Sequence, residues 1–160
     1  MRHHLVRSFI VLGALLLVGC GTPNPGPADA GLVCPTTPIA VTTAKLQVDV
    51  ITPICASCHK TAGTAVTYGV WDTAEHSQAA MVGVASIYNT GTPALKVVDP
   101  RKLANSTTYL KLLGGSPTFN GPHGENIGGQ MPSAATPPVT ITAEQIDEVR
   151  NWICSGAVAQ

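Results

Sequence analysis

Four segments of the chain carry the patterns of short helices, and the clearest one lies near the C-terminal end. Thr142 and Gln145 stand at the spacing of a capping box, which satisfies free backbone N–H groups at a helix start. Apolar residues then recur at helical spacing and form one face: Ile146, Val149, Trp152 and Ile153. Gly156 follows this face and is expected to end the helix.

An earlier helix is expected over residues 43–54. Leu46, Val50 and Ile54 stand at fourfold spacing there, although neighbouring β-branched residues weaken the pattern. Pro53 is expected to distort the end of this helix.

Two further helices are expected in the middle of the chain. Thr73 is a suitable cap for a helix that runs to Met81, and Ser106 for one that runs to Leu113. The sequence shows no strand alternation, so these patterns predict an all-α fold. The stretch between residues 114 and 138 is rich in Gly and Pro and is expected to be a loop; loops of this length are usually functional or disordered.

The N-terminal segment has the pattern of an export signal. A basic head is followed by the short apolar run 8–18 and then by Cys20, and this ending resembles a bacterial lipobox. The resemblance implies a signal peptide over residues 1–19, a lipidated Cys20 and a flexible Pro/Gly-rich tether over 20–33, which leaves the folded domain over 34–160.

This interpretation predicts an exported lipoprotein held at a membrane by the acyl chains on Cys20. Gly21 is not the aspartate associated with inner-membrane retention in some bacteria, so an outer-membrane, periplasm-facing or cell-surface location is favoured. Without residues 1–19 the chain has 7 Lys and Arg against 9 Asp and Glu, a net charge of −2. Nothing in this charge pattern indicates nucleic acid as a partner.

The pentad from Cys55 to His59 has the spacing that attaches haem c. Two residues between Cys55 and Cys58 place both thiols on one helical turn, where they add to the two vinyl groups of one haem, and His59 is then directed at the iron. Three alternatives to haem attachment remain. A thioredoxin-like redox pair requires a βαβ pattern, and a zinc site requires two more ligands nearby. The third alternative is a chance pentad with an ordinary disulfide. The adjacent histidine and the export signal favour one covalent haem c.

From about residue 51 to residue 157 the chain resembles the mono-haem, class I-like domains of bacterial lipoprotein cytochromes c. Three stretches carry the resemblance: the pentad, Val97-Val98-Asp99-Pro100 with Ser106-Thr107-Thr108-Tyr109-Leu110, and Met131-Pro132 with the last helix. The resemblance implies about four short helices around one haem, with a long Gly/Pro-rich loop that supplies the sixth iron ligand. Met131 occupies that place.

The residues around Met131 support it independently as the sixth ligand. Nearby glycines let the backbone approach a flat ring, and Pro132 stiffens the turn. Met81 fits core packing better, because it ends an amphipathic helix. His123 lies in the same loop as Met131 and is the competing ligand, and an open or water-held iron site is the remaining alternative.

Other residues have supporting roles in this interpretation. Tyr109, Leu110 and Trp152 are expected, with Leu113, Ile127 and Val149, to wall the haem pocket or to be plain core. Three cations are candidates to pair with haem propionates, against the alternative of solvated surface charge: Arg101, Lys102 and Arg150. A disulfide between Cys34 and Cys154 is expected, because both lie in the exported domain without another partner and the terminal helices meet in the resembling fold.

We therefore expect a membrane-anchored electron-transfer protein with redox protein partners in the periplasm or membrane, and no enzymatic activity of its own. His59 and Met131 would be the two axial ligands of the iron. The alternative is a haem enzyme, such as a peroxidase or the haem subunit of a dehydrogenase, or a gas-binding protein; each of these would use an open iron site.

Overall fold

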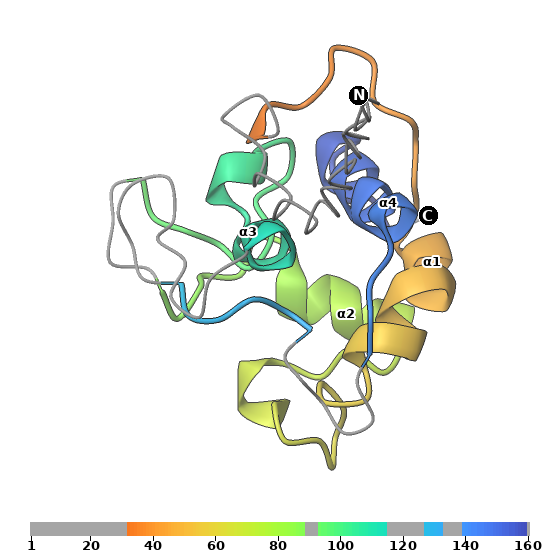
Figure 1. Ribbon diagram of the computed structural model, residues 1–160, viewed down its shortest axis with the longest axis vertical. Coiled ribbons are helices and arrows are strands. Elements are labelled where there is room, and N and C mark those ends of the chain that lie inside the picture. The colour runs from red at the N-terminus through yellow and green to blue at the C-terminus, as the bar shows by residue number, and fades with distance from the viewer. Residues whose placement is uncertain (1–31, 89–92, 115–126, 133–138, 160) are drawn as a thin grey trace, which may run out of the picture.

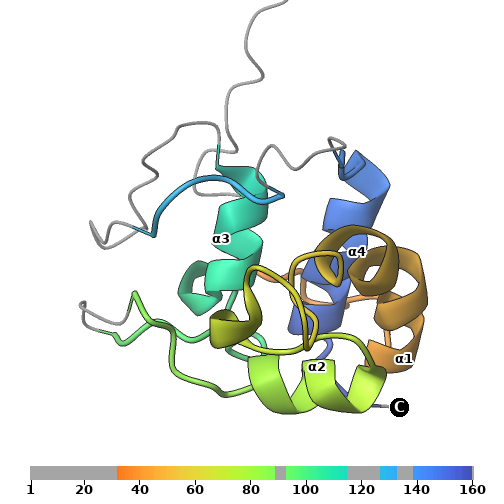
Figure 2. The same ribbon diagram turned by 90° about the horizontal axis from the view of Figure 1, so that it is seen from below.

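The computed structural model describes residues 32–88, 93–114, 127–132 and 139–159, and in these residues the protein is all-α (Figures 1 and 2). The described residues hold four α-helices, one π-helical segment, two 3₁₀ turns and isolated β-bridges but no longer strand. In chain order the helical elements are α1 (Thr43–Leu46), η2 (Gln47–Cys55), η3 (Val66–Tyr68), α2 (Ala74–Met81), η4 (Leu103–Asn105), α3 (Thr107–Leu113) and α4 (Ala143–Cys154). The predicted signal peptide, Cys20 and most of the predicted tether lie outside the described residues.

Helix α4 has the predicted cap and the predicted buried face. The Thr142 hydroxyl accepts a hydrogen bond from the Gln145 backbone, and the Gln145 side chain accepts one from the Thr142 backbone. Trp152 and Ile153 are fully buried, and the helix packs against both α1 and α3 (Figures 1 and 2). Gly156 has a φ of +110°, so glycine meets the left-handed requirement of the chain reversal after the helix.

The expected helix over residues 43–54 forms, but only its first turn is α-helical. Thr42 caps α1, which continues without a break into the π-helical η2. Pro53 has no N–H to donate and its ring crowds the preceding turn, so a regular α pattern cannot continue through it. The Ala56 N–H accordingly bonds to the Ile51 carbonyl, five residues back, at 2.8 Å.

Helices α2 and α3 occupy the predicted segments, but only one has the predicted type of cap. The Thr73 hydroxyl accepts from the His76 N–H and so closes the start of α2. The Ser106 hydroxyl makes no bond to α3 and instead joins the turn before it, accepting from the Asp99 N–H at 2.9 Å and donating to the Lys102 carbonyl at 2.8 Å.

A polar cluster joins α1, α2 and the end of the chain inside the core. The Trp152 indole N–H donates to the Thr43 hydroxyl at 3.0 Å, and the Gln78 side chain bonds both Thr43 and the Ala157 carbonyl. Beside it, Cys34 and Cys154 form the predicted disulfide, with Cα atoms 5.4 Å apart. The two ends of the described chain are thus tied to the same core.

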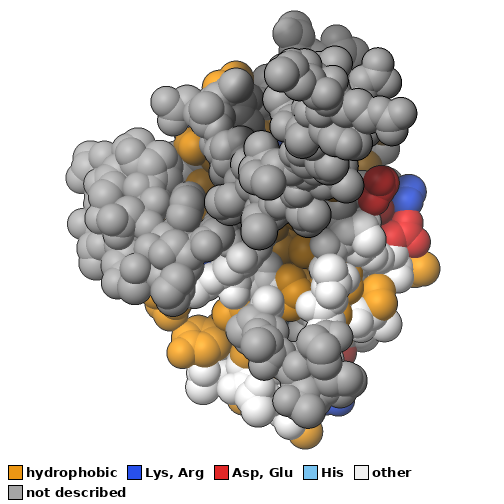
Figure 3. Space-filling model, in the orientation of Figure 1, with side chains coloured by type: hydrophobic (Ala, Val, Ile, Leu, Met, Phe, Trp, Pro, Cys, Tyr) orange, Lys and Arg blue, Asp and Glu red, His pale blue; other side chains and the backbone are white. Residues whose placement is uncertain are grey.

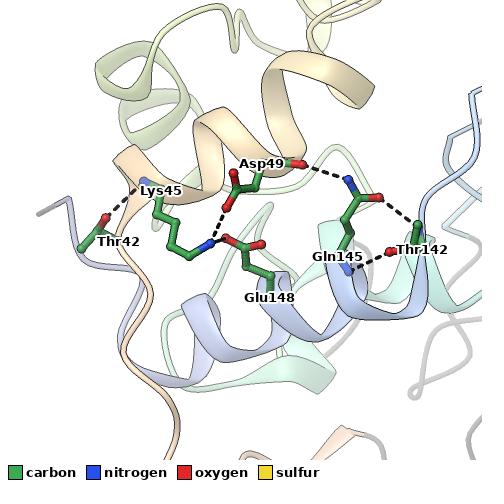
Figure 4. Close-up of polar contacts among 6 residues, drawn as sticks. All are labelled: Thr42, Lys45, Asp49, Thr142, Gln145 and Glu148. Atoms are coloured by element: carbon green, nitrogen blue, oxygen red, sulfur yellow. Dashed lines mark hydrogen bonds and ion pairs between the residues drawn. The ribbon is translucent and has the colours of Figure 1, made fainter.

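A group of charged side chains lies on the surface of α1, η2 and α4. The Lys45 ammonium pairs with Asp49 and with Glu148, and the Gln145 amide donates to the Asp49 carbonyl at 2.9 Å, so α4 is joined to α1 and η2 (Figure 4). In the view of Figure 3 most of the visible charge gathers at the edge over α1 and α4. Among the described residues, none of the helices has the length and apolar character needed to cross a membrane.

Candidate functional site

A cavity of about 610 Å³ opens between the end of η2, α3 and the segment 127–132. Its volume is within the usual range of small-molecule and cofactor sites. Apolar side chains make up much of its wall, including Ile54, Trp71 and Leu112. Three chemically distinctive groups lie in the same wall, namely the pentad cysteines, His59 and Met131.

The turn after η2 presents the pentad to this cavity. The N–H groups of Cys58 and His59 both donate to the Cys55 carbonyl, at 3.2 and 3.0 Å, so the helical path continues through the motif. The chain then folds back tightly at Gly63. A Cβ at this position would lie 2.0 Å from the Cys58 carbonyl oxygen, so only glycine fits there.

Both pentad cysteines are free thiols and line the cavity. Burial, with a smaller contribution from the neighbouring Cys58, raises the pKa of the Cys55 thiol to about 12. Cys55 is therefore a neutral thiol at physiological pH.

The His59 imidazole stacks on the Trp71 indole, with ring centroids 3.7 Å apart and planes 3° from parallel. The Trp71 backbone is held at both of its polar groups: its N–H donates to the His59 carbonyl at 2.7 Å, and its carbonyl accepts from the Gln47 amide at 3.0 Å. The Gln47 amide oxygen in turn accepts from the buried Ser77 hydroxyl at 2.7 Å. Residues of η2 and α2 thus fix the place of the stack.

The surroundings of the His59 ring favour its neutral form. Burial is the main cause that lowers its pKa, and the positive charge of Lys111 lowers it further, against an opposing hydrogen bond with the Gly69 backbone. His59 Nδ1 is buried without a hydrogen-bond partner among the described residues, as is Trp71 Nε1. Buried polar atoms without a partner are rare in folded proteins. The third such atom among the described residues, Arg150 Nε, lies outside the cavity wall.

Met131 is brought to the cavity by bonds to the end of α3. The Met131 N–H donates to the Lys111 carbonyl at 2.9 Å, and the Gln130 amide donates to the Leu112 carbonyl at 3.4 Å. These carbonyls belong to the last turn of α3, which has no later helical N–H to bond. The segment 127–132 therefore lies beside α3 in both views (Figures 1 and 2). Met131 is 36% exposed, whereas Met81 is 2% exposed and packs in the core.

None of the six residues expected to wall the haem pocket or to be plain core lies in the cavity wall, and all six lie in or against the hydrophobic core clusters. Tyr109 and Trp152 lie in the main hydrophobic core, and Leu110 lies in a second cluster with Leu95 and Ile127. The reason is the rotation of α3, whose cavity-facing residues are Thr107, Thr108, Lys111 and Leu112. Tyr109 and Leu110 consequently belong to the opposite side of this helix.

The cations suggested for propionates also lie away from the cavity. The Lys102 ammonium is 3.6 Å from the Asp99 carboxylate, the Arg150 guanidinium donates to the Val33 carbonyl, and Arg101 is likewise absent from the lining. His123 lies outside the described residues. Trp71 and Lys111 were not predicted as site residues, since only the folded chain brings these two residues to one cavity.

Comparison of the chain with protein-family models, with curated proteins and with solved structures gives no match in any of the three.

Proposed function

We propose that this protein is a mono-haem c-type cytochrome that carries electrons as a membrane-anchored, exported lipoprotein. The observation that carries the proposal is the composition of one cavity wall. It contains two free thiols at the haem-attachment spacing, a histidine with an unpartnered buried nitrogen, and a methionine from a distant segment. The volume and apolar character of the cavity fit a haem.

Each of these side chains has a role in holding the group. Cys55 and Cys58 would form the thioether links to the haem, and His59 and Met131 would bind its iron. Haem, when bound, supplies an iron that accepts and releases one electron. Trp71 and the bonds beneath it hold the imidazole of His59, and the apolar wall excludes water, which together with a thioether ligand favours the reduced state.

Staining for haem after denaturation tests the covalent attachment. The unmutated protein should keep the stain, because thioether bonds survive unfolding, and Cys55→Ala with Cys58→Ala should lose it. The matched control is Cys34→Ser with Cys154→Ser, which removes two cysteines away from the cavity and should leave the stain. A stain that persists in the Cys55/Cys58 variant contradicts the assignment.

The sixth ligand distinguishes an electron carrier from an open-site haem protein. With Met131 on the iron, the oxidised protein should show a weak near-infrared sulfur-to-iron band that Met131→Ala removes and Met81→Leu retains. Rapid binding of carbon monoxide by the unmutated protein, without this band, would instead support the peroxidase-like or gas-binding alternative.

The proposed anchor rests on Cys20 and the segment before it. Cys20→Ser should move the protein from the membrane fraction to the soluble periplasmic fraction, because the acyl chains provide the membrane affinity. Acylation detected by mass spectrometry at a different residue would contradict the lipobox interpretation.

A further inference from the structure

Lys111 is the one lysine, and the one residue with a permanent charge, among the described residues that line the cavity. No Asp or Glu of the described chain is part of this wall. The remaining lining side chains are apolar, or are neutral groups such as hydroxyls and thiols, apart from His59, whose neutral form is favoured by burial. The cavity thus combines an apolar body with a single positive charge.

Among the described residues, the contacts of Lys111 provide its charge with no counterion. The ammonium donates to the Gly129 carbonyl at 3.3 Å and lies 4.7 Å from the centroid of the Tyr88 ring. It forms no ion pair with a carboxylate of the described residues. Burial lowers the pKa of Lys111, in keeping with a cation that has lost part of its hydration.

Three of the four other described lysines differ in this respect, and the fourth, Lys60, is exposed and outside the cavity wall. Lys45 pairs with Asp49 and Glu148, while Lys96 and Lys102 both approach Asp99, at 3.5 and 3.6 Å. The Lys111 carbonyl accepts the hydrogen bond from the Met131 N–H, so the position of Lys111 on the cavity wall is fixed together with that of Met131.

We propose that Lys111 binds a carboxylate of the ligand in this cavity. This inference rests on the proposed function, in which that carboxylate is a propionate of the haem. The acidic edge of the cofactor then lies beside the last turn of α3. An ammonium–carboxylate hydrogen bond is stronger than one to a neutral carbonyl, and it neutralises a partly desolvated charge. The ligand class is a flat apolar molecule with an acidic edge.

Vibrational spectroscopy of the haem-loaded protein tests the contact. Lys111→Met keeps the apolar stem and removes the charge, so it should shift the propionate bending band in the resonance Raman spectrum and lower the midpoint potential. Lys111→Arg should restore both values towards those of the unmutated protein. Lys102→Met, which removes a lysine charge outside the cavity, is the matched control and should change neither.

A crystal structure of the unmutated haem-loaded protein gives a second measurement that does not depend on a variant. Lys111 Nζ within hydrogen-bond distance of a propionate oxygen supports the proposal. Nζ still on Gly129 with both propionates elsewhere overturns it, as does an unshifted propionate band in Lys111→Met. An unmutated protein without covalent haem overturns the proposed function as well, so the two failures are distinguishable.

Discussion

Two buried tryptophans mark two regions that differ in their hydrogen bonding: the core around Trp152 and the cavity wall around Trp71. Trp152 is fully buried in α4, and its indole N–H donates to the Thr43 hydroxyl. Trp71 is 8% exposed and lines the cavity, and its indole N–H has no partner among the described residues. The same residue type is therefore satisfied in one region and unsatisfied in the other.

This difference between the two regions supports the proposed ligand site at the cavity. A buried polar group without a partner costs free energy, so folded proteins keep few of them. Around Trp152 the polar groups of Thr43 and Gln78 find their hydrogen-bond partners within the protein. Trp71 belongs to the same hydrophobic core cluster as Trp152, but its side chain and that of His59 also line the cavity, and each has a ring nitrogen without a partner among the described residues.

The largest expected effect belongs to the disulfide beside the core around Trp152. Replacing Cys34 and Cys154 by Ser frees a loop with a sequence separation of 120 residues. By the chain-entropy model the free energy of unfolding should fall by about 4–5 kcal/mol. Denaturant unfolding measures this loss. An unchanged unfolding midpoint would show that the disulfide does not constrain the unfolded chain.

The two tryptophans themselves provide the next test. Trp152→Phe removes the bond to Thr43 and leaves a void in a packed core, so the free energy of unfolding should fall by about 3 kcal/mol. Trp71→Phe removes an N–H that bonds nothing described and should cost about 1 kcal/mol. Urea unfolding of the haem-free proteins compares them. Equal losses would contradict the division into two regions.

The sequence predicted the helices whose signals are local. Thr73 and the pair Thr142 with Gln145 identify helix starts within a few residues, because a cap acts on its own first turn. The π-helical form of η2 was not predicted, although Pro53 marked the place of the distortion. Propensity and spacing do not specify which of two helical hydrogen-bond patterns a neighbouring proline imposes.

Two parts of the candidate site were predicted from the sequence: the pentad, whose residues are adjacent, and Met131, which was expected from the family resemblance and its Gly/Pro-rich surroundings and lies in the same cavity wall. The pentad is contiguous, so its spacing alone brought Cys55, Cys58 and His59 together. The side of α3 that faces the cavity depends on how that helix is rotated against α4, and for this reason Tyr109 was expected in the wall and Lys111 was missed. Contacts between distant segments decide such rotations, and local sequence does not record them.

Gly69 and Gly83 separate two costs of a substitution: backbone strain at a positive φ, and a steric clash of the added Cβ with a neighbour. Gly69 has φ +114° and ψ 148°, and an added Cβ would lie 2.7 Å from Trp71 Nε1. Gly83 has φ +75° with open space around it. Gly69→Ala should lower the free energy of unfolding by about 2 kcal/mol and Gly83→Ala by about 1 kcal/mol, both measured in denaturant. A larger loss for Gly83→Ala would contradict a close fit of the backbone around Trp71.

The smallest expected effect is a dependence of stability on pH in the cavity. Burial lowers the pKa of His59 in the folded state below its ordinary value of 6.5, so the unfolded chain binds a proton first as the pH falls. The His59 contribution is therefore constant above pH 6.5, becomes destabilising as the pH drops through that value, and levels off below the folded pKa. The haem-free Cys55→Ala, Cys58→Ala protein should accordingly lose stability between about pH 7 and pH 5.

The same protein with His59→Gln provides the control for this pH effect. Its free energy of unfolding should fall less over that interval, because the glutamine takes up no proton in either state. Asp72 and Glu144 have a lowered pKa in the folded protein, so their contributions are lost only as the pH falls below their ordinary values of 3.8 and 4.5, outside the interval. Parallel curves for the two proteins would show that His59 titrates alike when folded and unfolded. In that case the imidazole is solvated, and the contrast between the cavity and the core around Trp152 no longer includes it.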